Sequence, residues 1–148
     1  MTAVRGGDKF ALALSQIAKQ LSRPEVVRVG FLEGATYPDG TPVGLVAAVN
    51  EYGAPSRGVP PRPFFRNMIA DKSADWPEAL GKTLQATGLD QTKALELMGQ
   101  GVAAQLRQSI VETDSPPLAQ STIDRKGSSK PLVDTGHMLN SVDYEVKS

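Results

Sequence analysis

Apolar residues recur at the three-to-four spacing of a helix face in two long segments of the chain. In residues 8–21 the expected N-cap is Asp8. The apolar stripe of this segment consists of Phe10, Leu14, Ile17 and Leu21. In residues 90–112 the stripe consists of Leu95, Met98, Val102, Leu106 and Ile110. Gly99 and Gly101 interrupt the second segment at a cost of about 1 kcal/mol each relative to alanine. They predict either close packing against another helix or a bend.

Two shorter helices are expected between these segments. The apolar positions of residues 43–52 suit either a helix or a strand. The alanines at 47–48 and the polar pair Asn50 and Glu51 favour a short helix that ends at Gly53. Pro63 is a favourable first residue for a further helix that reaches about residue 84 or 86. We expect the Trp-Pro pair at residues 76–77 to kink or restart it.

Strand signals occur near both ends of the chain. Residues 26–32 are rich in β-branched side chains, and Val142, Tyr144 and Val146 alternate with polar residues. A short helical turn at residues 137–139 precedes the second strand. The prediction is a single α+β domain over residues 1–148, with a small mixed or antiparallel sheet packed by three or more helices. Mobile loops are expected at about 34–42, 53–62 and 114–130, the last with one helical turn at 119–124.

Composition limits the chemistry that this chain can perform. Its 148 residues contain no cysteine and one histidine, which excludes disulfides, thiolate metal sites and centres that need two histidines. No apolar run approaches the roughly 18 residues of a membrane span. Residues 1–8 lack the apolar core of a secretory signal. We therefore expect a chain assembled in the cytoplasm, with no metal, cofactor or membrane partner.

Charge is balanced over the whole chain but not along it. The 16 basic and 16 acidic side chains favour neither nucleic acid nor a membrane as partner. Residues 1–74 nevertheless carry a net +3 and residues 75–148 a net −3. The difference is either compositional scatter or a pair of complementary ends that would let copies stack head to tail.

One tripeptide invites an enzymatic interpretation. Asp134, Thr135 and Gly136 form the active-site sequence of aspartic proteases, which pair two such aspartates. Too little chain follows Asp134 for the rest of that architecture, and a turn-capping role is the alternative. His137 lies three residues from Asp134, but no hydroxyl partner is marked as activated. We therefore predict no catalytic residues.

The most unusual surface segment is residues 50–66. Four prolines restrict it, which lowers the entropy lost on docking. No acidic residue occurs from Tyr52 to Ala70, whereas three arginines do. Arginine and aromatic side chains dominate the energetics of protein interfaces. Alternatively, Phe64 and Phe65 enter the core, and Arg62 and Arg66 form ion pairs at a helix end.

Two blocks of this sequence resemble a known family. The first comprises VNEYGA at residues 49–54 and VPPRPFFR at 59–66, and the second is PLVDTGHMLNSV at 131–142. Their order and separation are similar to those of the small neck, head–tail joining and tail-completion proteins of tailed bacteriophages and prophages. The resemblance implies a non-enzymatic α+β virion protein whose copies form a hexameric ring at the head–tail junction or tail end. Its partners would be further copies of itself and head-connector or tail-tube proteins, without sequence-specific nucleic acid.

The loop at residues 54–66, which is rich in proline and arginine, and this resemblance together indicate a set of candidate interface residues. They are Glu51, Tyr52, Pro61, Arg62, Pro63, Phe64, Arg66, Asp134, Thr135, Gly136 and Leu139. Two other functions remain open. One is an adaptor or regulatory module that binds a protein partner through residues 54–66 without forming a ring. The other is a hydrolase that uses Asp134 or His137.

Overall fold

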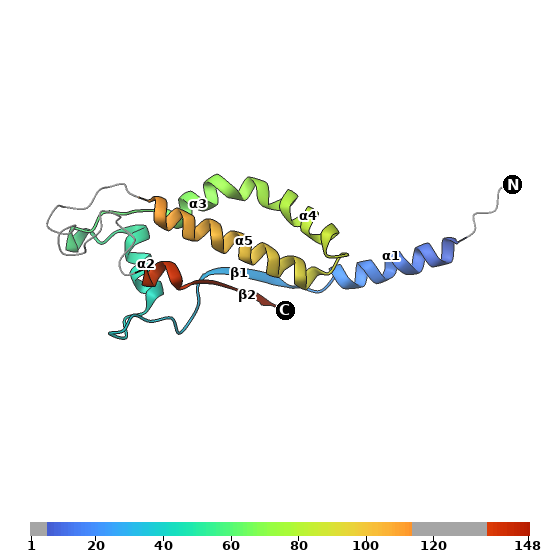
Figure 1. Ribbon diagram of the computed structural model, residues 1–148, viewed down its shortest axis with the longest axis horizontal. Coiled ribbons are helices and arrows are strands. Elements are labelled where there is room, and N and C mark those ends of the chain that lie inside the picture. Colours follow the sequence, from blue (N-terminus) through green and yellow to red (C-terminus); the bar gives the residue numbers. More distant parts are fainter. Residues whose placement is uncertain (1–5, 114–135) are drawn as a thin grey trace.

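The computed structural model describes residues 6–113 and 136–148 of the chain (Figure 1). The helices are α1 (Gly7–Leu21), α2 (Val43–Tyr52), α3 (Phe64–Lys72), α4 (Trp76–Ala86), α5 (Gln91–Glu112) and α7 (His137–Asn140). The strands are β1 (Val26–Phe31) and β2 (Val142–Lys147). Short 3-10 turns occupy Pro55–Arg57 and Ser73–Asp75. This arrangement confirms the predicted α+β class, with an antiparallel sheet.

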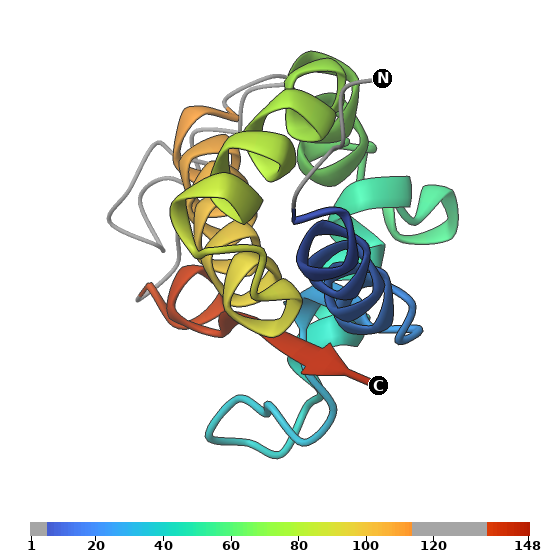
Figure 2. The same ribbon diagram turned by 90° about the vertical axis from the view of Figure 1, so that its right-hand side faces the viewer.

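The sheet pairs a strand near the start of the chain with a strand near its end. β1 pairs with β2 in a register that runs from Val26 opposite Lys147 to Phe31 opposite Val142. Helix α5 packs across this sheet, and α3 and α4 pack on the other side of α5. Figures 1 and 2 show the resulting order of layers, with α5 between α4 and the sheet. The longest helix is therefore the centre of the fold.

The core lies where α2, α3, α5, α7 and the sheet meet. Its largest fully buried side chains are Phe64, Leu106, Ile110, Val43 and Val142. The ring of Phe64 meets that of Phe31 edge to face, with centroids 6.3 Å apart. Ser109 in α5 donates its hydroxyl proton to the Phe64 carbonyl oxygen at 2.6 Å. Because Phe64 belongs to the first block and Val142 to the second, both blocks contribute to one core.

Gly99 allows the close approach of α5 to the sheet. A Cβ atom at this position would lie 2.5 Å from Cδ2 of Tyr144 and 2.9 Å from Cγ2 of Val27. The prediction of close packing was therefore right for Gly99, but the neighbour is the sheet rather than another helix. Gly101 is exposed, and a Cβ there would meet nothing within 4 Å.

The structure corrects two predicted helix starts. The N-cap of α1 is Gly6 with φ +93°, and Asp8 lies inside the first turn instead of capping it. Pro63 is the N-cap of α3 rather than its first residue. The helix at residues 43–52 and the restart at Trp76 are confirmed. The expected loop at 114–130 and its turn at 119–124 lie outside the described residues.

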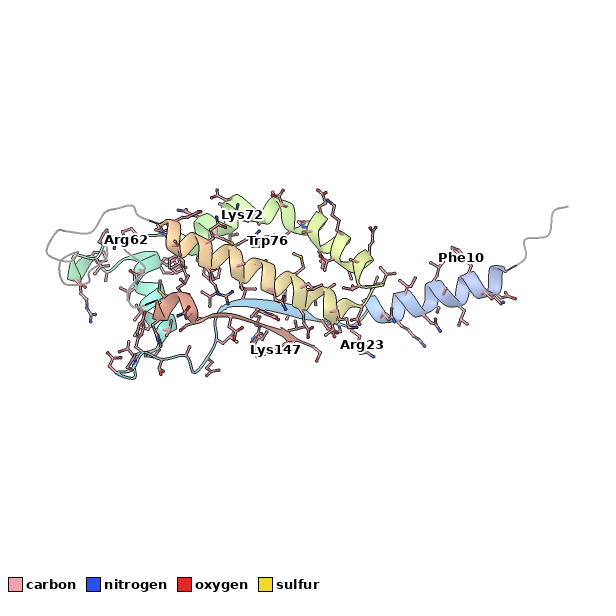
Figure 3. The ribbon with its side chains drawn as sticks, in the orientation of Figure 1. Phe10, Arg23, Arg62, Lys72, Trp76 and Lys147 are labelled. Atoms are coloured by element: carbon pink, nitrogen blue, oxygen red, sulfur yellow. The ribbon has the colours of Figure 1, made fainter. Side chains whose placement is uncertain are left out.

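Helix α1 differs from the other long helices because it projects from the body along the longest axis of the molecule (Figure 1). None of its residues is buried. Phe10 is 67% exposed, and Figure 3 shows it pointing away from the rest of the chain. Among the described residues, no helix is long and apolar enough to cross a membrane.

Candidate protein–protein interface

The segment between α2 and α3 is a structured loop. The backbones of Ala54 and Val59 exchange two hydrogen bonds of 2.8 and 3.1 Å, which close a small turn around Pro55–Arg57. Gly53 has φ +75°, and a Cβ there would lie 2.8 Å from both the Val59 oxygen and the Pro61 nitrogen. Only glycine fits this position without displacing the backbone. The glycine of the first block is therefore required by the geometry of the loop.

Glu51 organises the start of α3 from a distance in the sequence. Its carboxylate is buried at the end of α2. Oε2 accepts a hydrogen bond from the Phe65 N–H at 2.9 Å, and Oε1 accepts from the Arg66 N–H at 3.0 Å. These are N–H groups of the first turn of α3, where the helix has no side-chain cap of its own. A carboxylate is also favoured there by the helix dipole. Glu51 therefore caps α3.

The same carboxylate positions an exposed Arg–Tyr pair. Arg66 donates from Nε to Glu51 Oε1 at 2.8 Å and from Nη2 to the Glu51 carbonyl oxygen at 3.1 Å. These bonds hold the guanidinium 4.9 Å from the centre of the Tyr52 ring. Tyr52 is 67% exposed and the Arg66 side chain 55%. The pair is thus accessible and already arranged, which lowers the entropy cost of binding a partner.

A shallow groove lies beside this pair between α2 and α3. Its volume is about 290 Å³, and Ala48, Tyr52, Phe65, Arg66 and Ile69 are among its lining residues. Leu45 is 57% exposed and lies one and two turns before Ala48 and Tyr52 on the same face of α2. Together these residues form a surface of mixed apolar and aromatic character. We call the Tyr52–Arg66 pair and this groove the α2–α3 face.

Other nominated residues are buried inside the chain. Phe64 is 1% exposed and Arg62 is 5% exposed, so neither offers much surface to a partner. The Arg62 N–H donates to the Asn50 carbonyl oxygen at 2.7 Å, which ties the loop to α2. Burial lowers the pKa of the Arg62 guanidinium from its usual value. The interpretation of residues 50–66 as a surface segment is therefore wrong at Arg62 and Phe64. Pro61 is exposed and Pro63 half-buried.

The described part of the second block packs against α5 and the core. Gly136 is the N-cap of α7, and Leu139 packs half-buried against the core. His137 donates from Nε2 to the Thr36 carbonyl oxygen at 2.7 Å, and its ring lies 4.7 Å from that of Tyr37. These contacts give His137 a structural role. Asp134 and Thr135 lie outside the described residues. In the described part of the chain, no group of three or more acidic or histidine side chains is placed to hold a metal ion.

The structure thus brings together Glu51, Tyr52 and Arg66, whereas His137 of α7 contacts Thr36 and Tyr37. Sequence reasoning nominated these three, and missed Leu45 and Ile69, which are single apolar residues without a local signal. It also predicted the apolar stripe of α1 without indicating that the stripe stays exposed. The exposure depends on what α1 packs against, which periodicity does not encode.

In comparisons with known proteins, no family model, no curated protein and no solved structure matches this chain.

Proposed function

We propose that this protein is a non-enzymatic structural subunit of a phage or prophage virion, which forms a ring at the head–tail junction or the tail end. The observation that carries the proposal is the prearranged Tyr52–Arg66 pair, held by buried Glu51 on the exposed α2–α3 face. The sequence blocks that resemble the neck and tail-completion proteins provide both this pair and part of the core.

The physical argument concerns preorganisation. A virion subunit must present the same surface in every copy, so its contact residues benefit from a rigid support. Tyr and Arg are the residue types that most often dominate binding energy. Here Glu51 joins α2 to α3 through three hydrogen bonds, and Gly53 allows the loop between them to close tightly. The α2–α3 face is therefore suited to contact a head-connector or tail-tube protein.

The proposal is tested by co-expressing the full chain with the proteins encoded by its neighbouring genes. We expect the chain to co-purify with a portal, head-connector or tail-tube protein, and negative-stain imaging to show ring-shaped particles. Tyr52→Ala should weaken this association by about thirtyfold, as for an interface hot spot. Leu97→Ala is the control, because Leu97 is also exposed, at 50% against 67% for Tyr52, but lies on α5 outside the α2–α3 face.

Two outcomes would contradict the proposed function, and a third would contradict the proposed contact surface. A stable one-to-one complex with a protein outside the virion would support the adaptor function instead. Hydrolysis that is lost in Asp134→Asn would support the hydrolase. Equal binding by Tyr52→Ala and the wild type would show that the α2–α3 face is not the contact surface.

A further inference from the structure

The apolar stripe of α1 has no partner within its own chain. Phe10, Leu14 and Leu21 are 67%, 49% and 41% exposed, and Ile17 between them is only half-buried. All four lie within about 60° of one another around the helix axis, given 100° per residue. Leu12 is 61% exposed but lies on the opposite side of the helix. An amphipathic helix of this kind normally buries such a stripe.

The body of the same chain contains an apolar groove of about 560 Å³. It lies between β1, the α3–α4 pair and α5. Its lining includes Val27, Ile69, Trp76, Leu80, Leu95 and Val102. Among the described residues that line it, only Ser73 and Trp76 have polar side chains, and Trp76 already donates from Nε1 to Gln105 Oε1 at 2.9 Å. An occupant of this groove must therefore be apolar.

Residues 22–25 connect α1 to β1 and are held by contacts with the start of α5. Gln91 at the start of α5 donates from Nε2 to the Arg23 carbonyl oxygen at 2.9 Å. Thr92 donates its hydroxyl proton to the Glu25 carboxylate at 2.9 Å. Pro24 between them has a fixed φ. These contacts hold the connection between α1 and β1 at the end of the body from which α1 projects (Figure 1).

We propose that the apolar stripe of α1 docks into this groove of a second copy of the chain. This interface, which we call the α1 joint, is head to tail, because the helix of each copy binds one neighbour and its groove binds another. Such a heterologous interface closes into a ring or continues as a filament. The inference deepens the proposed function, and rests on it only for the closing of the ring.

The area of this joint sets the expected behaviour in solution. Fifteen residues give a helix roughly 22 Å long, and burying half of its surface with the matching groove removes about 900 Å² from water. Stable interfaces bury about 1,600 Å², and transient ones less than about 1,200 Å². A single joint is therefore weak. Assembly depends on protein concentration, and closure that gives every copy two joints stabilises the ring.

The first experiment measures the molar mass of the full chain by light scattering after size exclusion, over a wide concentration range. We expect the wild type to associate with rising concentration. Leu14→Lys should weaken association by about tenfold or more, since it places a charge in the joint. Leu12→Lys is the matched control, because it makes the same change on the opposite face of the same helix and should have less than about a twofold effect. Circular dichroism checks that both variants keep the helix.

The second experiment separates docking between copies from docking within one. Leu80→Lys blocks the groove at a half-buried residue that does not line the groove of the α2–α3 face, with Leu97→Lys as its control on α5 outside the groove. Leu14→Lys and Leu80→Lys should each stay monomeric. Their mixture should form a one-to-one dimer, because it contains one intact groove and one intact helix.

Three results would overturn the inference. These are a mixture that stays monomeric, a Leu14→Lys variant that assembles like the wild type, and a wild type that is monomeric at every concentration. The proposed function has a separate test. If Leu14→Lys still forms rings with the neighbouring virion proteins, the proposed function stands and the α1 joint is wrong. If assembly depends on α1 but the co-expressed chain co-purifies with no portal, head-connector or tail-tube protein, the joint stands and the proposed function fails.

Discussion

Helices α1 and α5 carry the same sequence pattern and have opposite structural roles. Each has an apolar stripe at three-to-four spacing, yet five residues of α5 are buried and none of α1 is. The reason is position: α5 lies between the sheet and α3–α4, whereas α1 extends beyond them (Figure 1). Hydrophobic periodicity thus predicts that a helix has an apolar face, but not whether its own chain covers that face.

The largest expected effect comes from a substitution in the buried apolar stripe of α5. Leu106→Ala in α5 should lower the free energy of unfolding by about 3 kcal/mol, because it leaves a cavity at a fully buried position. Leu14→Ala should change it by less than about 0.5 kcal/mol in the monomer, since exposed side chains contribute little to folding. Urea denaturation at low protein concentration measures both. Equal losses would mean that α1 packs against its own body in solution.

A second comparison concerns two glutamates at the starts of helices. Glu51 is buried and caps α3 from α2, whereas Glu78 is exposed in the first turn of α4. Glu51→Gln should lower the free energy of unfolding by about 2 kcal/mol, since the neutral amide replaces a buried carboxylate that accepts three charge-assisted or capping hydrogen bonds. Glu78→Gln is the control. It removes an ion pair with Lys82 in which both side chains are 74% exposed, and should cost less than about 0.5 kcal/mol. A similar loss in both variants would show that Glu51 does not cap α3.

Two glycines in α5 sharpen the comparison further by giving opposite signs. Gly99→Ala should destabilise the protein by about 1–2 kcal/mol, because its Cβ would overlap Tyr144 and Val27. Gly101→Ala should stabilise it by about 0.5–1 kcal/mol, because alanine favours the helix and meets no neighbour there. Thermal unfolding of the two variants checks the signs. Stabilisation by both would mean that α5 does not approach the sheet closely at Gly99.

The smallest effect concerns local capping. Asp90 caps α5 by accepting a hydrogen bond from the Lys93 N–H at 3.1 Å, so Asp90→Ala should cost about 1 kcal/mol. Asp8 lies in the first turn of α1 without capping it, so Asp8→Ala should cost only a few tenths of a kcal/mol. Helix content and denaturation midpoints distinguish the two. A larger loss for Asp8→Ala would contradict the assignment of Gly6 as the N-cap.

The candidate site was predictable in its composition but not in its arrangement. The prolines, arginines and aromatics of residues 50–66 indicated an interface segment from the sequence. The structure then separated exposed Tyr52 and Arg66 from buried Phe64 and Arg62. The burial of Phe64 depends on its contacts with Phe31 in β1 and Ser109 in α5, which lie far from it in sequence. Residue type therefore predicts the kind of chemistry, whereas burial decides which residues can perform it.

The sequence by itself determined where helices and strands begin and end, to within a residue or two at most boundaries. Local rules suffice for this, because proline, glycine and the apolar period act over a few neighbouring residues. Tertiary structure alone decided that Glu51 caps a helix fourteen residues away, that Gly99 faces the sheet, and that α1 is left uncovered. Each of these depends on which surfaces meet in space, and short-range sequence patterns do not specify that.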